Sequence, residues 1–256
     1  MEETTAAKND LIIGRNAVLE ALQSGRAIDT VMVARGDRTG SIGKIMCLCR
    51  EKGIVVKDVD EKKLSFSCGH SNHQGVAAYA AAHEYAELED IFALAESRGE
   101  QPFIIICDEL EDPHNLGAVI RSAEAAGAHG VVIPKRRSAT LSYAVAKTSA
   151  GALEYVPVAR VPNIPTLLED LKKRGVWVYA ADMGGQLWCD TNFDGPVALG
   201  VGSEGRGVGR LVREHCDFVV SLPMAGKINS LNASVAAGIL MFEVAKQRLK
   251  NGGNKS

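Results

Sequence analysis

The sequence predicts an α/β protein built in two parts, with a mostly parallel sheet in the second part. Three observations carry this prediction. Uninterrupted apolar runs recur after residue 102, as in strands that are buried on both faces of a parallel sheet. Segments with helical spacing lie between those runs, an alternation typical of a layered α/β fold. The first 80 residues also alternate short strand and helix patterns, which predicts a smaller α/β unit.

In the first part, each element follows from a local signal. A helix is expected after Gly14, because apolar residues recur at helical spacing as far as Leu22 and Ser24-Gly25 ends the pattern. The elements that follow are expected as strand, helix, strand, helical turn and strand, at residues 30–34, 42–50, 54–56, 61–66 and 75–80.

The segment 83–101 differs in character and is interpreted as a linker. It begins with polar and acidic residues, and Ile91, Leu94 and Ala95 then form one short amphipathic pattern before Pro102. The alternative is that this helix packs as an ordinary surface helix of a single domain.

The second part is expected to alternate five strands with helices. The strands are expected at residues 103–107, 130–133, 176–179, 197–200 and 218–222. The helices are expected at residues 116–126, 143–148, 164–174, 208–215 and from about 231 to 250. Ligands of such sheets bind outside the carboxyl ends of the strands, so functional residues are expected there.

Composition excludes several classes of function. The 256 residues are 46% hydrophobic and 23% charged, with a formal net charge of -2, which is ordinary for a folded protein. Neither the first 84 residues nor the remainder is basic overall, so contact with RNA has to come from local patches. No signal-peptide pattern, membrane-spanning stretch or Cys-x-x-Cys pair is present. We therefore expect a soluble, cytoplasmic protein with reduced cysteines and no membrane contact.

Three polar clusters follow strands of the second part. In the first, Asp112-Pro113 predicts a turn and Asn115 is a suitable helix N-cap. Gly117, Arg121 and Glu124 share one helical face, so Gly117 would leave room beside the arginine. An arginine there can hold a phosphate or a carboxylate in a bidentate grip. The alternative is a surface helix on which Arg121 and Glu124 form a solvated pair.

The second cluster, at residues 200–207, is rich in glycine and contains Glu204. It holds a G-x-G-x-x-G pattern directly after a strand, as dinucleotide-binding proteins do. That fingerprint also needs an acidic residue about 20 positions later, whereas the next strand ends in Leu222-Pro223. NAD is therefore disfavoured, but the glycines still indicate backbone lying close to a ligand.

The third cluster lies between the last strand and the last helix. Ser230, Asn232 and Ser234 crowd the start of that helix, where free backbone N–H groups bind an anion or are capped. One of the three suffices as a cap. Because each cluster follows a strand of one sheet, the three are expected to form one site.

Stretches of these clusters closely resemble motifs 1, 2 and 3 of the SpoU/TrmH family, the RNA 2'-O-ribose methyltransferases of the SPOUT class. They are Asp-Pro-His-Asn-Leu-Gly-Ala-Val-Ile-Arg-Ser-Ala (112–123), Gly-Ser-Glu-Gly-Arg-Gly-Val (202–208) and Leu-Pro-Met-Ala-Gly-x-x-x-Ser-Leu-Asn-Ala-Ser-Val-Ala (222–236), in family order and spacing. The resemblance covers residues 103–248. It extends more loosely to the first 80 residues, where 13–18 and 73–76 resemble the family's substrate-binding domain. Leu222 replaces a common isoleucine, a swap that conserves volume.

The resemblance implies a C-terminal SPOUT methyltransferase domain with a trefoil knot over residues 102–256. It also implies a linker over 83–101 and a smaller N-terminal RNA substrate-binding domain over 1–82 with an L30e-like fold. Periodicity could not indicate the knot, since threaded connections are rare. S-adenosylmethionine is implied as methyl donor, held largely by backbone groups near Gly202, Leu222 and Leu231. Family members are homodimers whose active sites combine residues of both subunits.

The polar residues that match family positions are the predicted catalytic residues. They are Asn115, Arg121, Glu204, Ser230 and Asn232. The family's motif 1 arginine is held to assist deprotonation of the ribose hydroxyl, but an arginine pKa above about 12 makes it a poor base. We expect Arg121 instead to grip an RNA phosphate and to stabilise the developing alkoxide. Glu204 is expected to orient Arg121, and Asn115 and Asn232 to position ribose or cofactor.

RNA is expected to be held by local positive charge. The candidates are Lys135-Arg136-Arg137, followed by Arg206, Arg210 and Arg213, each with a solvated surface residue as the alternative. Arg15-Asn16 beside Gly14 is expected to contribute to recognition of RNA shape. Cys68, His70 and His73 match no standard zinc spacing, so no metal is expected.

The sequence therefore predicts an enzyme that uses S-adenosylmethionine to methylate the ribose 2'-hydroxyl of a guanosine in 23S rRNA. The two-domain layout resembles bacterial family members with that substrate. The alternatives are a tRNA or another rRNA site as target, and a non-catalytic RNA-binding protein of ribosome assembly that keeps the fold. The complete set of polar motif residues favours the enzyme. No contact with DNA is expected.

Overall fold

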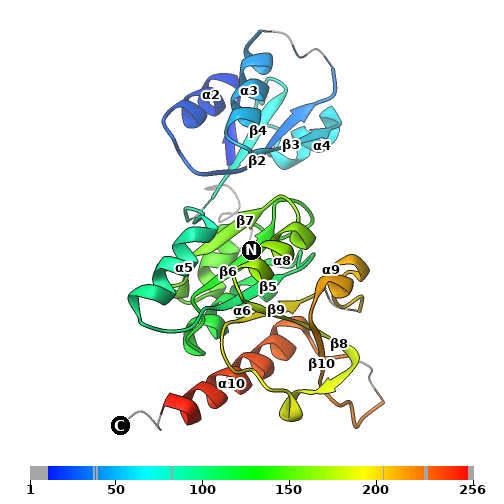
Figure 1. Ribbon diagram of the computed structural model, residues 1–256. Helices are drawn as coiled ribbons and strands as arrows, with labels where there is room; N and C mark the ends of the chain where they lie inside the picture. The colour runs from blue at the N-terminus through cyan, green and yellow to red at the C-terminus, as the bar shows by residue number, and fades with distance from the viewer. Residues whose placement is uncertain are drawn as a thin grey trace. The chain divides into compact units, whose positions relative to one another are not determined.

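The computed structural model of the chain describes residues 11–36, 38, 40–81, 83–203, 205–227 and 230–252. The chain divides into two compact units, Met1–Glu84 with Thr140–Tyr143, and Tyr85–Ala139 with Ala144–Ser256. Figure 1 labels most of the helices and strands of both units. None of the helices in these described ranges has the length and apolar character that crossing a membrane requires.

The first unit is a four-stranded sheet with helices on both faces. Its strand order is β1-β4-β2-β3, with β4 antiparallel to β1 and β2, and with β2 parallel to β3. Alternate residues of β2 face opposite sides: Val31 and Val33 pack with α2 and α3, and Met32 packs with α4. The elements are β1 (Leu11–Ile13), α2 (Arg15–Gln23), β2 (Ile28–Ala34), α3 (Gly40–Glu51), β3 (Val55–Val59), α4 (Glu61–Ser67) and β4 (Val76–Ala80).

The expected helices and strands of this part are confirmed, with ends shifted by a few residues. Strand β1 has no counterpart among them, because its three residues are too few to display an alternating pattern.

The second unit is a six-stranded, wholly parallel sheet in the order β10-β8-β9-β5-β6-β7. This confirms the predicted α/β class. The strands are β5 (Phe103–Cys107), β6 (Gly130–Pro134), β7 (Val158–Val161), β8 (Trp177–Leu187), β9 (Val197–Val201) and β10 (Phe218–Ser221). The helices are α5 (Leu88–Ser97), α6 (Pro113–Ala125), α7 (Tyr143–Thr148), η1 (Ala152–Glu154), α8 (Ile164–Lys173), η2 (Trp188–Asp190), α9 (Arg210–His215) and α10 (Ala233–Gly252).

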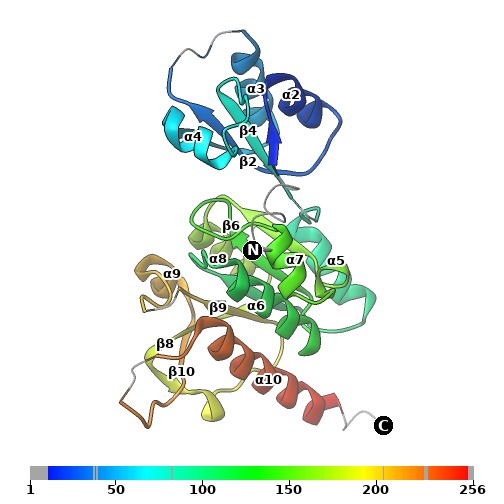
Figure 2. The same cartoon turned by 180° about the vertical axis from the view of Figure 1, so that it is seen from behind.

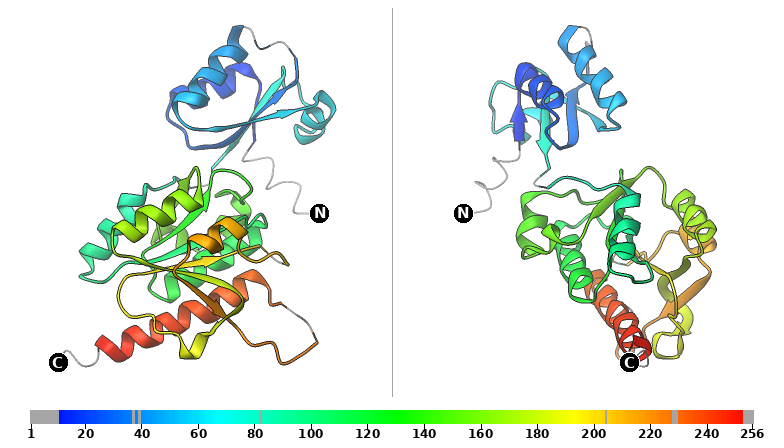
Figure 3. Two further views of the ribbon diagram at one scale, coloured as in Figure 1. Left: turned by 45° about the vertical axis from the view of Figure 1, so that its right-hand side comes forward. Right: turned by 60° about the vertical axis from the view of Figure 1, so that its left-hand side comes forward.

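Helices cover both faces of this sheet. Ile104 and Ile106 of β5 belong to an apolar cluster with α5, α8 and α9. On the other face α6 and α10 contact each other, as Figure 2 shows from behind. Figure 3 shows the same layers from two further sides. Ile91 of α5, in the segment expected as a linker, is fully buried in this cluster, and a Cβ added to Gly130 would overlap its side chain.

Strand β7 is the one strand of this sheet that the sequence patterns do not indicate. It has four residues, pairs with β6 at the end of the strand order, and forms a single bridge to Ala86. It carries Arg160, whose guanidinium lies 4.6 Å from the centre of the Tyr85 ring. A short edge strand with a charged residue lacks the apolar run that marks the central strands.

Two polar side chains bind backbone groups at the amino edge of the sheet, where the strands begin. His129 is fully buried, and its Nδ1 accepts a hydrogen bond from the Phe103 N–H at 2.9 Å, while its Nε2 lies 3.0 Å from Glu100 Oε2. Arg248 of α10 donates to the carbonyls of Gln101, Pro102 and Gly195 at 2.8–3.1 Å. These bonds fasten the last helix to the starts of the central strands.

Candidate functional site

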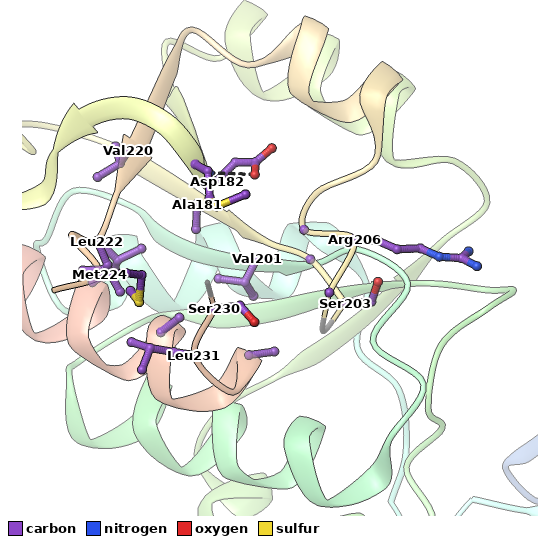
Figure 4. Close-up of a pocket in the computed structure, with 17 residues that line it drawn as sticks. Ala181, Asp182, Val201, Ser203, Arg206, Val220, Leu222, Met224, Ser230 and Leu231 are labelled. Atoms are coloured by element: carbon purple, nitrogen blue, oxygen red, sulfur yellow. Dashed lines mark hydrogen bonds between the residues drawn. The ribbon is translucent and has the colours of Figure 1, made fainter. Parts of the chain in front are cut away.

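A cavity of about 430 Å³ lies at the carboxyl edge of the six-stranded sheet. Four parts of the chain form its wall (Figure 4). They are the part of β8 that lies beyond its pairing with β9, the loop after β9, the loop after β10 and the first turns of α10. The residues that line it are Ala181, Asp182, Met183, Val201, Gly202, Ser203, Gly205, Arg206, Gly207, Val220, Leu222, Met224, Ser230, Leu231, Ala233, Ala236 and Leu240. The volume falls within the range of small-molecule sites, roughly 300–1,000 Å³.

The cavity has an apolar side and a polar side. Leu222, Met224 and Leu231 lie together in Figure 4, whereas the guanidinium of Arg206 points away from them. Ser203 and Ser230 add hydroxyl groups to the wall. An apolar pocket with a few placed polar groups is the usual form of a site that orients an organic ligand.

The glycines of the loop after β9 make that loop tight. Gly207 N–H donates to the Ser203 carbonyl at 3.0 Å, and Gly205 and Gly207 have φ of 78° and 64°, in the left-handed region that glycine tolerates. A Cβ added to Gly202 would overlap the Gly207 backbone. The glycine pattern therefore lets this loop fold closely on itself beside the cavity.

Asp108, directly after β5, ties this loop to the sheet. Its Oδ2 accepts a hydrogen bond from the Gly209 N–H at 2.8 Å, and the residue is 6% exposed. Burial raises the pKa of this carboxyl above its ordinary value, the Gly209 bond lowers it in part, and Glu109 adds to the rise.

Two asparagines from distant motifs join beside the cavity. Asn232 Nδ2 donates to Asn115 Oδ1 at 2.9 Å, and Asn232 Oδ1 accepts from the backbone N–H groups of Ser234 and Val235. Asn232 is therefore the cap of α10. The expectation that Asn115 caps α6 is wrong: Asp112 is the N-cap, with its side chain accepting from the His114 N–H, and Asn115 lies buried in the first turn. The first turn of one helix is thus bonded to the start of the other.

The room expected at Gly117 is filled by another helix rather than left for Arg121. A Cβ on Gly117 would overlap the Thr148 side chain of α7, so the glycine permits close packing of α6 on α7. Arg121 is exposed and does not line the cavity, and it has no ion-pair partner within the described part of the chain.

The structure brings most of the predicted site residues together. Gly202, Leu222, Ser230 and Leu231 line one cavity, and the Asn115–Asn232 pair adjoins it. Arg121 stands apart on α6. Glu204 lies outside the described residues, so its expected contact with Arg121 stays a prediction.

Sequence reasoning missed Asp182. The register between β8 and β10 passes from Ala180↔Val219 to Gln186↔Val220, so residues 181–185 form a bulge at the cavity. Asp182 Oδ2 is 2.9 Å from Arg213 Nη1 in an ion pair. The available signal was an aspartate followed by Gly184-Gly185 just beyond an apolar run, the same kind of signal that Asp108 gives.

The predicted RNA-binding cations differ in whether they form ion pairs within the chain. Arg137 pairs with Glu109, Arg210 with Glu214 and Arg213 with Asp182. Arg136 and Arg206 are exposed, and neither has an ion-pair partner among the residues that the structure describes.

In the first unit, the side-chain Nε of Arg15 donates to the backbone carbonyl of Gln74 at 2.8 Å, and the backbone N–H of Arg15 donates to Gln74 Oε1 at 3.2 Å. This joins the two stretches that resemble a substrate-binding domain. The neighbouring His73 uses Nδ1 to accept from the Gly75 N–H and Nε2 to bond Ser65. In the part of the chain described here, no group of three or more His, Cys, Asp or Glu side chains is arranged to hold a metal ion.

A parallel sheet with an amphipathic cavity between loops at its carboxyl edge defines an α/β ligand-binding protein of the layered class. Comparison with known proteins makes the assignment specific. Residues 102–242 match the SpoU rRNA methylase family, and residues 11–86 match the RNA 2'-O ribose methyltransferase substrate-binding domain. The chain belongs to the SpoU/TrmH family of RNA methyltransferases.

Individual relatives agree with this assignment. The Bacillus subtilis protein YacO, named as belonging to the TrmH family of tRNA/rRNA methyltransferases, is 51% identical over 94% of this chain and 97% of its own length. The crystal structure of the SpoU methyltransferase AviRb from Streptomyces viridochromogenes, with AdoMet, shares the fold at a TM-score of 0.59 and 24% identity, over 94% of this chain and 90% of that one. An AdoMet-bound rRNA methyltransferase from Sinorhizobium meliloti has a TM-score of 0.54 and 25% identity, over 92% of this chain and 86% of that chain.

Proposed function

We propose that this protein methylates the ribose 2'-hydroxyl of a guanosine in 23S rRNA, with S-adenosylmethionine as methyl donor. The observation that carries the proposal is the convergence of the segments after β9 and β10 on one cavity, with the motif 1 and motif 3 asparagines bonded beside it. The RNA 2'-O-methyltransferase chemistry rests on the family to which the chain belongs.

The cavity fits the cofactor in volume and chemistry. S-adenosylmethionine, the cofactor predicted from the sequence, is confirmed for the family by the solved members that contain it. The apolar wall of Leu222, Met224 and Leu231 suits a flat aromatic base, while Asp182 gives a negative charge to set against a cationic ligand. The glycine loop brings backbone groups close to the space. We assign cofactor binding to Gly202, Leu222 and Leu231.

The bound donor supplies an electrophilic methyl group, and the residues of this chain supply positioning and charge. The ribose oxygen has to be held in line with that methyl group and has to lose its proton. Asn115 and Asn232, fixed by their mutual bond, position ribose or cofactor, and Ser230 offers a hydroxyl at the cavity wall. Arg121 grips an RNA phosphate and stabilises the developing alkoxide, and Glu204 orients it. Arg121 does not act as the base.

The choice of 23S rRNA rests on the two-part architecture. The first unit matches a substrate-binding domain and presents Arg15 bonded to Gln74. We place the L30e-like RNA substrate-binding domain at residues 1–82 and the knotted methyltransferase domain at 102–256. The connecting segment 83–101 joins the two and adds α5 to the core of the second unit. A tRNA target is the second candidate, because YacO is named for both kinds of RNA.

We also propose that the enzyme is a homodimer whose active site combines residues of both subunits. Val235, Ile239 and Phe242 are exposed at helical spacing along α10, so they form an apolar stripe without cover in the single chain. Arg121 lies away from the cavity of its own chain, as a residue that completes the partner's site would. A Phe242→Asp protein is expected to sediment as a monomer, and an unchanged dimer would contradict the role of this stripe.

The test is transfer of a labelled methyl group to 23S rRNA that lacks its own methylations, with tRNA in parallel. The modified position is mapped by reverse-transcription stops at low nucleotide concentration. A single 2'-O-methylguanosine in 23S rRNA is expected. Label in tRNA alone would overturn the substrate and keep the chemistry. Cofactor binding without transfer to free RNA or to ribosomal particles would favour a non-catalytic RNA-binding protein.

A further inference from the structure

We propose that Asp182 makes the cavity discriminate between the cationic methyl donor and its uncharged demethylated product, and that Arg213 limits the strength of this discrimination. The inference rests on the proposed function, because it takes S-adenosylmethionine as the ligand. Neither residue belongs to the three motifs that carry the family resemblance.

The local fold brings Asp182 to the cavity. Residues 181–185 bulge out where the β8–β10 register jumps, and Ala181, Asp182 and Met183 all line the cavity. Gly185 permits the bulge, since a Cβ there would overlap the backbone of Val219. Bulges beside functional sites re-aim side chains that a regular strand would direct elsewhere. The departure from the regular ladder therefore places a carboxylate in the wall of the ligand site.

Asp182 is well shielded from solvent and held in one place. Its side chain is 16% exposed, Oδ1 accepts from the Met183 N–H at 2.7 Å, and Oδ2 accepts from Arg213 Nη1 at 2.9 Å. Arg213, on α9, is 41% exposed and also donates to the Met183 carbonyl at 3.3 Å. The arginine thus sits on the more solvated side of the pair, where water screens its charge better than that of the carboxylate.

Charge in the rest of the wall is sparse. Among the described residues that line the cavity, Asp182 is the one carboxylate and Arg206 the one cation. Arg206 is exposed, and its guanidinium points away from the apolar side. A charge in a low-dielectric wall acts over several ångströms, so the carboxylate of Asp182 favours a positive charge on the ligand without direct contact.

The reaction changes that ligand charge. As the ribose oxygen forms its bond to the methyl carbon, the carbon–sulfur bond breaks and its electron pair stays on sulfur, which becomes a neutral thioether. The ribose hydroxyl releases its proton to solvent. The donor therefore carries one positive charge more than the product. A negative wall favours the donor over the product, which aids exchange of spent cofactor after each turnover.

A structural role makes a different prediction. Asp182 Oδ1 would lie 3.0 Å from a Cβ on Gly207, so the side chain also packs against the glycine loop. If packing were its whole role, replacing Asp182 would weaken donor and product equally. The ratio of the two dissociation constants separates the two roles, because effects on loop geometry and folding largely cancel in it.

The experiment is calorimetric titration of S-adenosylmethionine and of S-adenosylhomocysteine into the full-length protein and three variants. The ratio of product Kd to donor Kd is expected to fall about fivefold in Asp182→Asn, which keeps the shape and removes the charge. It is expected to rise about threefold in Arg213→Met, which leaves the carboxylate uncompensated. Glu214→Gln, on the same helix and paired with Arg210 at the surface, is the matched control and should leave the ratio unchanged.

The outcomes separate the two proposals. An unchanged ratio in Asp182→Asn, with both ligands still binding, overturns the role of Asp182 and leaves the proposed function standing. If the wild-type protein binds neither ligand, the proposed function fails first. Should Asp182→Asn not fold, the Arg213→Met ratio decides: a rise supports the inference, and no change or a fall overturns it.

Discussion

The two edges of the six-stranded sheet use polar residues in opposite ways. At the amino edge, His129 bonds with both ring nitrogens and Arg248 donates to three carbonyls, so both side chains are tied to the backbone or to a neighbouring side chain inside the fold. At the carboxyl edge, glycine-containing loops surround a cavity, and the charge of Arg206 is exposed. The amino edge is built for stability and the carboxyl edge for binding.

This contrast predicts that residues at one edge determine the stability of the fold and that residues at the other edge determine activity. Buried polar groups that lose a partner cost roughly 1–3 kcal/mol each, so variants at the amino edge should unfold more easily and still turn over. Exposed groups at the carboxyl edge contribute little to folding, so their variants should fold normally and fail in function. Five variants, with their controls, test the separation.

The largest effect is expected at Arg121. Arg121→Ala should lower kcat by about 100- to 1,000-fold, as loss of a charge that stabilises a developing anion does. Its unfolding free energy should change by less than about 0.5 kcal/mol, because the side chain is exposed. Methyl transfer and chemical denaturation measure the two quantities. Glu124→Gln, at an exposed position of the same helix, is the control, and near-normal transfer by Arg121→Ala would remove Arg121 from the mechanism.

A smaller loss is expected at Gly202. In Gly202→Ala the new Cβ overlaps the Gly207 backbone, so the loop beside the cavity has to move. Cofactor affinity should fall by about tenfold, since the loss of roughly one hydrogen bond from the displaced loop corresponds to about that factor in Kd. Gly226→Ala is the matched control, because nothing lies within 4 Å of its added Cβ. Equal affinities of the two variants in calorimetry would show that the loop geometry does not matter.

At the amino edge, the expected effect is on stability and depends on pH. Burial lowers the pKa of His129 below the ordinary value of 6.5, while the hydrogen bond to Glu100 acts against this. A depressed pKa in the folded state gives stability that is present above pH 6.5 and is lost as the pH falls through the folded value. Wild-type protein should therefore lose more unfolding free energy than His129→Gln as the pH falls from roughly 7 to 5.

Glutamine at position 129 can accept from Phe103 and donate to Glu100 without titrating, so methyl transfer should persist. Denaturant unfolding at several pH values is the measurement. If the unfolding free energies of the two proteins fell in parallel with pH, His129 would not be the group that causes the loss of stability at acid pH.

The smallest effect is expected from single surface cations. Arg136→Ala should weaken RNA binding by a few-fold and lower the slope of log K against log salt by about one. Arg137→Ala should do less, because Glu109 already pairs with Arg137 at 2.9 Å. Filter binding over a range of salt concentrations measures both slopes. A larger effect at Arg137 than at Arg136 would reverse the order of these contacts.

The sequence predicts the central strands and the cavity loops well, because their signals are local. Apolar runs mark β5, β6 and β9, and the glycine pattern marks the loop beside the cavity. Contacts across long sequence separations leave no such signal. Asn115 and Asn232 are 117 positions apart, and only the fold shows that they bond. Helical periodicity placed Gly117 on a face but could not show that α7 covers it.

The bulge at residues 181–185 is a second feature beyond local patterns. A strand signal ends at Tyr179, while the register jump depends on how β10 pairs with β8 much later in the chain. The apolar and helical patterns therefore do not mark Asp182 as a residue of the cavity. The sequence does carry one searchable signal, an aspartate that precedes two glycines at the end of a predicted strand.

Amide hydrogen exchange with and without S-adenosylmethionine tests the contrast between the edges most directly. Protection is expected in peptides that cover residues 181–183, 202–209 and 222–233 at the carboxyl edge. Peptides over residues 98–103 and 193–197 at the amino edge should exchange at unchanged rates. Protection confined to the amino edge, or absent at saturating cofactor, would contradict the assignment of the cavity as the cofactor site.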